Sequence, residues 1–453
     1  MTKPSLPQGT RDFSPETVRK RNYIFSIIRD CFERYGFQPL ETPAMENLDT
    51  LMGKYGEEGD RLIFKILNNG LNDPKNLEKA NAGFEKVLEG KHSSLITERA
   101  LKYDLTIPFA RYVAMNHGAL SFPFKRYQIQ PVWRADRPQK GRYREFTQCD
   151  ADVVGSQSLL NEVELAHIYH DVFTALGIKD YQLKINNRKI LAGLAALCGD
   201  PNKLTDITIA IDKLDKIGLE KVKAELTQKG LSETQIATIS AFLSISGSND
   251  EKIKQLETLL TSQESALQGI REIFTVLKQC EGLNISLDCT LARGLNYYTG
   301  CIYEVKAPEN IQIGSIGGGG RYDDLTGLFG VPDIPGVGIS FGVDRIYDVM
   351  EEMQLFPENL LQGCQAIFMN MGDAFTAANY QLMQGLRRQG ISCEMYHEAT
   401  KLDKQFKYAD RKKIRFAIIM GSNEMEEGVC MLKNLITGEQ TKVKPSALGE
   451  LLK

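Results

Sequence analysis

Residues 122–154 restrict the possible folds of this chain more than any other segment, because polar and apolar side chains alternate along two successive stretches. Side chains alternate between the two faces of a β-strand, so each stretch has one polar and one apolar face if both are strands. The polar positions are Gln128, Gln130 and Arg134 on the first stretch, and Gln148, Asp150 and Asp152 on the second. The apolar face carries Tyr127, Ile129 and Trp133, and then Cys149, Ala151 and Val153. The segment therefore predicts a β-hairpin with one continuous polar face.

The polar face of this hairpin has two interpretations. A solvated outer face is common in antiparallel sheets. The six polar residues, however, include no Lys and no Glu, which are the residues that usually keep a sheet surface in water. This composition favours the second interpretation, a polar floor beneath a bound ligand.

A strongly basic loop, residues 134–144, joins the two strands and has five basic side chains and one acidic side chain. Arginine guanidinium groups can form two parallel hydrogen bonds to phosphate oxygens. The loop therefore suits a polyphosphate or the end of a nucleic acid. A solvated charge cluster is the alternative, and the loop by itself does not decide between them.

The remaining sequence separates into regions of different character. Ser14 and Pro15 predict the start of a helix, which apolar residues at helical spacing continue to Tyr35. Residues 191–279 are rich in Lys, Glu, Leu and Ile and predict a helical insertion. Strand patterns resume at residue 285, and residues 364–453 alternate strand-like and helix-like segments, as in a small α/β domain.

Two further segments carry residues that could line a site. Tyr297 and Tyr298 are adjacent, but paired tyrosines are usually core or edge aromatics. The run Gly317–Gly320 predicts either a flexible hairpin or a backbone that a planar ligand can approach closely. Glycines 336, 338 and 342 lie along a strand rather than after it, which excludes a dinucleotide-binding turn, and no P-loop motif occurs.

Composition excludes several classes of protein. The net charge of the 453-residue chain is −3, so a strongly basic coat for nucleic acid is excluded, although a local basic patch is not. No apolar run approaches the roughly 20 residues that span a bilayer, and the N-terminus has no apolar signal region. The nine cysteines are scattered without a C-x-x-C pair, and the five histidines form no metal-ligand pattern. We therefore expect a cytoplasmic protein with reduced thiols and no protein-bound metal.

Several segments together resemble the motifs of class II aminoacyl-tRNA synthetases. They are Gly36–Pro43, the hairpin around Arg134, and Gly336–Arg345. The sequences RPQKGRYR at 137–144 and LARGLNYY at 291–298 resemble signatures of the histidyl-tRNA synthetase family, and PQGTRDF near the start is similar to its opening. The resemblance covers nearly the whole chain.

This resemblance implies an α+β catalytic domain with a mixed, mainly antiparallel sheet, formed by residues 1–190 and 280–355. It implies a helical insertion at 191–279, a separate anticodon-binding α/β domain at 364–453, and a homodimer. The implied reaction is the ATP-dependent activation of L-histidine to histidyl-adenylate, followed by transfer to the 3′ end of tRNA(His).

The resemblance also implies a histidine pocket. Asp104, Thr106 and Gln148 would hold the substrate amino group, and Asp152 and Tyr298 would face the imidazole, with Tyr297 and Tyr322 in the same pocket. The alternation agrees, since Gln148 and Asp152 share the polar strand face. Neutral imidazole has one donor and one acceptor, which a carboxylate and a phenol can satisfy. Such a site rejects apolar analogues by about 10⁴–10⁵.

For ATP, the resemblance implies that Arg134 and Arg345 bind the phosphates. Arg293 would contact the α-phosphate and the histidine carboxylate at the place where other class II enzymes hold a metal. Arg134 and Arg293 are thus the expected catalytic residues, and Mg²⁺ is expected only on the outer phosphates of ATP.

The sequence departs from common members of the family at a few positions. Asp104-Leu105-Thr106 stands where many bacterial members have E-G-T, and Asp152 stands where others have Glu. Both changes shorten the side chain by one methylene and keep its charge. Ala292 replaces a common Val and Asn296 a common Asp.

Two other functions remain open at this point. One is the synthetase-like regulatory subunit of ATP phosphoribosyltransferase, which lacks an anticodon domain. The other is a non-catalytic sensor of uncharged tRNA, a module usually embedded in a kinase chain.

Residues 401–413 carry six basic and two acidic side chains, which indicate either contact with a phosphate backbone or a solvated helix face.

Overall fold

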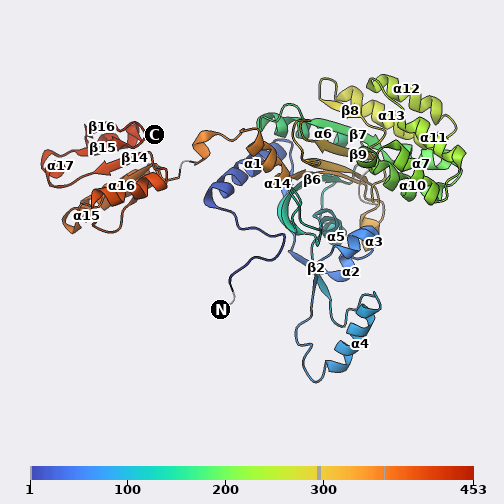
Figure 1. Cartoon of the computed structure of the whole chain (residues 1–453), viewed down its shortest axis with the longest axis horizontal. Helices are drawn as coiled ribbons and strands as arrows, with labels where there is room; N and C mark the ends of the chain where they lie inside the picture. The colour runs from blue at the N-terminus through green and yellow to red at the C-terminus, as the bar shows by residue number, and fades with distance from the viewer. Residues whose placement is uncertain (1–2, 293–296, 362, 453) are drawn as a thin grey trace. The chain divides into compact units, whose positions relative to one another are not determined.

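The computed structural model describes residues 3–292, 297–361 and 363–452. The chain forms two compact units, Met1–Leu355 and Phe356–Lys453, each with its own sheet (Figure 1). This arrangement confirms the expected fold class of an α+β unit with a mixed sheet and a separate C-terminal α/β unit. Within the described residues, no helix is both long and apolar enough to cross a membrane.

An eight-stranded sheet forms the centre of the first unit. Five of its neighbouring strand pairs are antiparallel, and the pairs at its two edges, β1 with β5 and β7 with β8, are parallel. The strands, in spatial order, are β1 (Gln38–Pro39), β5 (Phe124–Trp133), β6 (Glu145–Val154), β11 (Gly336–Gly342), β10 (Gly317–Tyr322), β9 (Cys301–Lys306), β7 (Gln182–Asn187) and β8 (Ile285–Leu287).

Strands β5 and β6 confirm the predicted hairpin. Their register sets Gln128 opposite Asp150 and Gln130 opposite Gln148, so the polar positions of the two strands meet on one face. The glycine run Gly317–Gly320 is not a flexible hairpin but belongs to β10, inside the sheet.

Helices cover the apolar face of this sheet. They are α1 (Pro15–Arg34), α6 (Leu160–Ala175) and α14 (Val343–Glu352). The helix α1 begins as predicted, because the Ser14 hydroxyl accepts a hydrogen bond of 3.2 Å from the Thr17 amide. The ring of Phe341 on β11 lies 5.9 Å from that of Phe32 on α1 and 4.8 Å from that of Tyr169 on α6. The apolar face is therefore the core, which leaves the polar face for other contacts.

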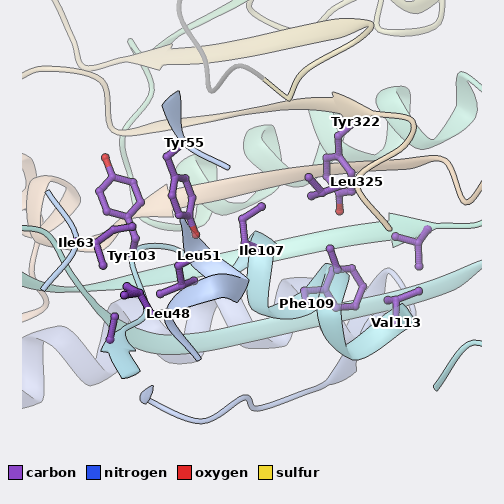
Figure 2. Packing of buried hydrophobic residues seen from close by; sticks show 13 residues of the cluster. Leu48, Leu51, Tyr55, Ile63, Tyr103, Ile107, Phe109, Val113, Tyr322 and Leu325 are labelled. Carbon is purple, nitrogen blue, oxygen red and sulfur yellow. The ribbon is translucent and has the colours of Figure 1, made fainter. Parts of the chain in front are cut away.

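A smaller layer packs next to the polar face. It contains a three-stranded sheet of β2 (Met45–Asn47), β4 (Arg99–Leu101) and β3 (Lys65–Ile66), with α2 (Leu48–Leu51), α3 (Gly56–Arg61), α5 (Thr106–Asn116) and η2 (Thr326–Phe329). The helix α4 (Leu77–Leu88) projects from this layer, away from the eight-stranded sheet (Figure 1). The buried residues of the layer form a hydrophobic cluster that includes Tyr55, Tyr103 and Ile107, and Tyr322 of β10 joins it (Figure 2). This cluster holds in place the side of the smaller layer that faces the eight-stranded sheet.

The segment 188–279 consists of helices joined by short loops, as its composition predicts (Figure 1). A capping box joins Ser232 and Gln235 at the start of α11, and a second one joins Ser248 and Glu251 at the start of α12. The helices are α7 (Arg188–Leu197), η1 (Pro201–Lys203), α8 (Leu204–Asp212), α9 (Leu214–Ile217), α10 (Leu219–Gln228), α11 (Glu233–Leu243), α12 (Asn249–Leu259) and α13 (Glu264–Gln279).

The second unit contains a five-stranded sheet between two apolar clusters. Its strands, in spatial order, are β13 (Cys393–Met395), β12 (Ala366–Phe368), β14 (Phe416–Ile419), β15 (Cys430–Asn434) and β16 (Gln440–Val443). Its helices are η3 (Glu358–Leu361), α15 (Asp373–Arg388), α16 (Leu402–Arg411), α17 (Ser422–Glu427), η4 (Pro445–Ala447) and α18 (Leu448–Leu451). Ile418 belongs to one cluster and its neighbour Ala417 to the other, so both faces of this sheet are buried.

Candidate active site

Two adjoining cavities lie on the polar face of the eight-stranded sheet. The small cavity has a volume of about 60 Å³, and the basic cavity has about 170 Å³. Both are lined by Arg134, Gln148 and Ser340, so they share a wall. Every described residue that the sequence placed in a site lines one of them: Asp104, Thr106, Gln148, Asp152, Tyr297, Tyr298, Tyr322 and Arg134 the small cavity, and Arg134 and Arg345 the basic cavity. Arg293 and Asn296 lie outside the described residues.

Asp104 forms one end of the small cavity, just before helix α5. Its Oδ1 atom accepts hydrogen bonds from the Tyr55 hydroxyl at 2.9 Å and from the Ile107 amide at 3.2 Å. Its Oδ2 atom accepts one of 3.3 Å from the Tyr297 hydroxyl. Burial raises the pKa of Asp104, while these donors and the nearby Arg134 lower it. The carboxylate is thus held in place and would attract a positively charged group.

Asp152 lies at the other end; one of its oxygens accepts a hydrogen bond, and the other is in an ion pair but has no hydrogen-bond partner among the described residues. Its Oδ1 accepts a hydrogen bond of 2.5 Å from the Tyr322 hydroxyl, and its Oδ2 lies 2.9 Å from Nη2 of Arg126, a fully buried guanidinium on β5. Burial raises the pKa of Asp152, and Arg126 opposes this rise. A Cβ atom on Gly338 would lie 2.0 Å from Asp152 Oδ1, so only glycine leaves room for this carboxylate.

Gln148, Ser340 and Asp150 line the stretch between these ends. The Ser340 hydroxyl accepts a 3.0 Å hydrogen bond from Gln148 Nε2 and donates one to Asp150. Burial raises the pKa of Asp150 to about 7, although Arg126 partly opposes this rise. Sequence reasoning placed Asp150 on the polar face but gave it no role, and it did not name Ser340. The strand alternation was the available signal for Asp150.

Two arginines of the basic cavity are held at fixed orientations. Arg134 donates from Nε to the Tyr103 carbonyl at 3.1 Å, and its guanidinium lies 4.3 Å from the centre of the Tyr103 ring. Arg345 donates to the carbonyls of Gly141 at 2.9 Å and Ser315 at 2.7 Å. Fixed guanidinium groups favour planar, multidentate binding of phosphate or carboxylate oxygens.

Asp344, which also lines the basic cavity, is already committed to structural contacts. Its Oδ1 atom forms ion pairs with the guanidinium groups of Arg11 and Arg21, each at a distance of 2.5 Å. Within the described part of the chain, no three His, Cys, Asp or Glu residues are grouped so that they could hold a metal ion. Taken together, the two cavities suit a small molecule with an amino group next to a polyphosphate.

The basic run of the second unit lies on and around helix α16. Its basic side chains are all exposed: Lys401, Lys404, Lys407, Arg411, Lys412 and Lys413. Phe406 and Tyr408, which interrupt the run, pack against the apolar cluster around Ile367. The two aromatic residues are therefore partly buried against the core, and the charges face the solvent.

Comparisons with known proteins identify the family of this chain. The family model for histidyl-tRNA synthetase matches residues 96–346, and that for the anticodon binding domain matches residues 365–453. The chain is 52% identical to a histidine–tRNA ligase of Flavobacterium johnsoniae and 53% identical to one of Phocaeicola vulgatus, in each case over 100% of this chain and 99% of the relative.

Solved structures give the same result. A histidyl-tRNA synthetase from Nostoc sp. PCC 7120 has a TM-score of 0.82 and 34% identity, covering 100% of this chain and 99% of that one. A Bacillus halodurans protein described as an ATP phosphoribosyltransferase regulatory subunit/histidyl-tRNA synthetase has a TM-score of 0.74. Its identity is 19%, and it covers 93% of this chain and 100% of its own, so this match shows the fold alone. The family model and the relatives that match along the whole chain show that it belongs to the histidyl-tRNA synthetase family.

Proposed function

We propose that this chain is a histidine–tRNA ligase. It activates L-histidine with ATP and then transfers the histidyl group to the 3′ end of tRNA(His). The observation that carries the proposal is the pair of adjoining cavities. The small cavity has carboxylates and phenols, the basic cavity has fixed arginines, and both share Arg134 and Gln148.

In the first half-reaction, a carboxylate oxygen of histidine attacks the α-phosphorus of ATP. A new bond between this oxygen and phosphorus forms, the bond between the α-phosphorus and the bridging oxygen breaks, and pyrophosphate leaves. In the second half-reaction, a terminal ribose hydroxyl of the tRNA attacks the carbonyl carbon and forms an ester bond, while the hydroxyl proton is released. The bond between this carbon and the phosphate oxygen breaks, and AMP leaves. Both steps need the histidine carboxylate at the wall between the two cavities.

The small cavity is proposed to bind histidine. Asp104, Thr106 and Gln148 hold the ammonium group, which the buried carboxylate of Asp104 would attract. Asp152 and Tyr298 lie toward the imidazole. Burial raises the pKa of Tyr297, Tyr298 and Tyr322, so these phenols stay protonated and can donate hydrogen bonds at neutral pH.

The basic cavity is proposed to bind ATP. Arg134 and Arg345 contact its phosphates, and Arg293 is assigned to the α-phosphate from the sequence alone. Mg²⁺ would enter with the nucleotide, bound through the outer phosphates, and would neutralise part of their charge. The chain's own arginines then stabilise the charge that develops on the α-phosphate.

The second unit is proposed to bind the anticodon region of tRNA(His), with the exposed lysines around α16 contacting the phosphate backbone. A homodimer is proposed from the family resemblance. A cytoplasmic location is proposed as well, because the tRNA and ATP that the reaction consumes are available there.

The test is ATP–pyrophosphate exchange driven by histidine, followed by charging of tRNA(His). A ligase gives both activities. A regulatory subunit of ATP phosphoribosyltransferase and a non-catalytic tRNA sensor would each give no exchange. The match of residues 365–453 to an anticodon-binding model favours the ligase over the regulatory subunit.

A further inference from the structure

Three carboxylates line the small cavity, and they differ in what they contact. Asp104 accepts three hydrogen bonds, and Asp152 is held by Arg126 and Tyr322. Asp150 is 3% exposed, and its Oδ1 atom has no hydrogen-bond partner among the described residues. A buried carboxylate oxygen without a partner carries a desolvation penalty, which a ligand with a suitable donor removes.

The position of Asp150 limits what that donor can be. Gln148, Asp150 and Asp152 are alternate residues of β6, so their side chains leave one face of the sheet about 6.6 Å apart. Gln148 lies at the wall shared with the basic cavity, where the histidine carboxylate must be for activation. Asp150 is one step farther into the small cavity and therefore lies beside the side chain of a bound histidine.

The charges of the cavity assign the remaining contacts. Asp104 is the carboxylate available to the ammonium group. Arg126 forms an ion pair with Asp152, whereas within the described residues it acts on Asp150 only through its charge, without an ion pair. Asp150 is then the remaining carboxylate, and a neutral imidazole brings one N–H donor.

We propose that Asp150 is a further specificity-determining residue, which accepts a hydrogen bond from the protonated ring nitrogen of the bound histidine. Asp152, fixed by Arg126 and Tyr322, forms the end wall of the imidazole pocket. This inference rests on the proposed function and extends it. Burial, with the nearby Asp152 and Asp104, raises the pKa of Asp150 to about 7, and an N–H donor at its Oδ1 atom would lower it.

The experiment measures the dissociation constants of two ligands by calorimetry for the wild-type chain and for Asp150→Ala. The ligands are L-histidine and 3-(imidazol-4-yl)propionate, which keeps the ring but lacks the amino group. We expect Asp150→Ala to weaken both ligands by the same factor, about 10- to 100-fold. ATP affinity should change less than about twofold, because Asp150 does not line the basic cavity.

Other results would overturn the proposal. If histidine binds more weakly but 3-(imidazol-4-yl)propionate binds as before, Asp150 contacts the amino group instead of the ring. Unchanged binding of both ligands would show that it makes no contact, and an equal loss of ATP affinity would indicate a general distortion of the site.

Two further variants support this reading. Asp150→Asn keeps the volume of the side chain and one acceptor oxygen but removes the charge, so both ligands should weaken about tenfold. If Asp150→Ala does not fold, Asp150→Asn is the variant whose ligand affinities are measured instead. Cys149→Ala alters the opposite face of β6 and controls for damage to the strand. Exchange by the wild-type chain tests the proposed function separately, whatever the Asp150 variants do.

Discussion

The eight-stranded and the five-stranded sheet differ in where their charged residues lie. On the eight-stranded sheet, Arg126, Asp150 and Asp152 are each at most 3% exposed and lie on the face that lines the small cavity. On the five-stranded sheet, both faces are covered by apolar clusters, and the charged residues of α16 are exposed to solvent. The first sheet forms a pocket from its own face, whereas the second is a scaffold that presents a basic surface.

This difference in the burial of charged residues reflects the different chemistry expected of each unit. Burying a charge is costly unless it is paired, so a sheet that buries three charges on one face loses stability in exchange for a preorganised site. A surface charge costs little and binds a phosphate backbone through long-range attraction. Substitutions in the first sheet should therefore affect both folding and the amino-acid step, and substitutions on α16 should affect tRNA alone.

The largest expected effect is that of Asp152→Ala. It leaves the buried Arg126 without its carboxylate, and breaking a buried pair in this way costs about 3–5 kcal/mol of unfolding free energy. Histidine binding should weaken more than ATP binding, as the sequence predicts. Urea denaturation measures the loss of unfolding free energy, and the KM values for histidine and ATP measure the change in binding.

Asp150→Ala is the matched control for that stability change, because it removes from the same strand face a carboxylate that Arg126 influences by its charge but with which, within the described residues, it forms no ion pair. We expect it to lower the unfolding free energy by less than half as much. Equal destabilisation by the two variants would show that the Arg126 contact does not distinguish these carboxylates.

Arg134→Ala should have the next largest effect. Loss of one preorganised donor to the reacting phosphate costs about 2.7–4 kcal/mol, or 10²–10³ in rate. Histidine-dependent exchange should fall by this factor while the thermal unfolding temperature changes little. Arg134→Lys keeps the charge but not the fork geometry and should recover only part of the rate. The sequence predicts the same loss for Arg293→Ala, and exchange within tenfold of wild type would reject either role.

Removing residues 363–453 should show that the two units have different functions. Exchange should survive, since both cavities belong to the first unit, provided that the shortened chain keeps its fold. Charging of tRNA(His) should fall by about tenfold or more, and the salt dependence of tRNA affinity should decrease. Equal charging by the shortened and full-length chains would refute an anticodon-binding role.

The smallest effect is expected from Lys404→Gln and Lys407→Gln together. If both lysines contact phosphates, the slope of log affinity against log salt should become less negative by about 0.7–0.9 for each. Exchange should be unchanged, and tRNA affinity at moderate salt should fall less than about fivefold. The same pair of changes at Lys221 and Lys223, on the helical insertion, is a control, and an equal change of slope there would argue for nonspecific attraction.

Much of this arrangement was predictable because it depends on local patterns. Alternation along residues 122–154 predicted the hairpin and its polar face, and Ser14 with Pro15 predicted the start of α1. The glycine run 317–320 was harder, because glycine gives no face pattern, and only its pairing with β9 and β11 made it a strand. The roles of the site residues stay predictions, although the cavities bring the described ones together.

The sequence by itself determined the family, the division into chemically different regions and the set of polar residues on β5 and β6. Only the tertiary structure decided which of the two neighbouring aspartates is paired. Tyr322, 170 positions away in the sequence, bonds Asp152 because β10 lies beside β11, and Arg126 reaches it across the β5–β6 register. Alternation assigns a side chain to a face, but pairing depends on the register between distant strands, and this register left the Oδ1 oxygen of Asp150 without a partner in the described chain.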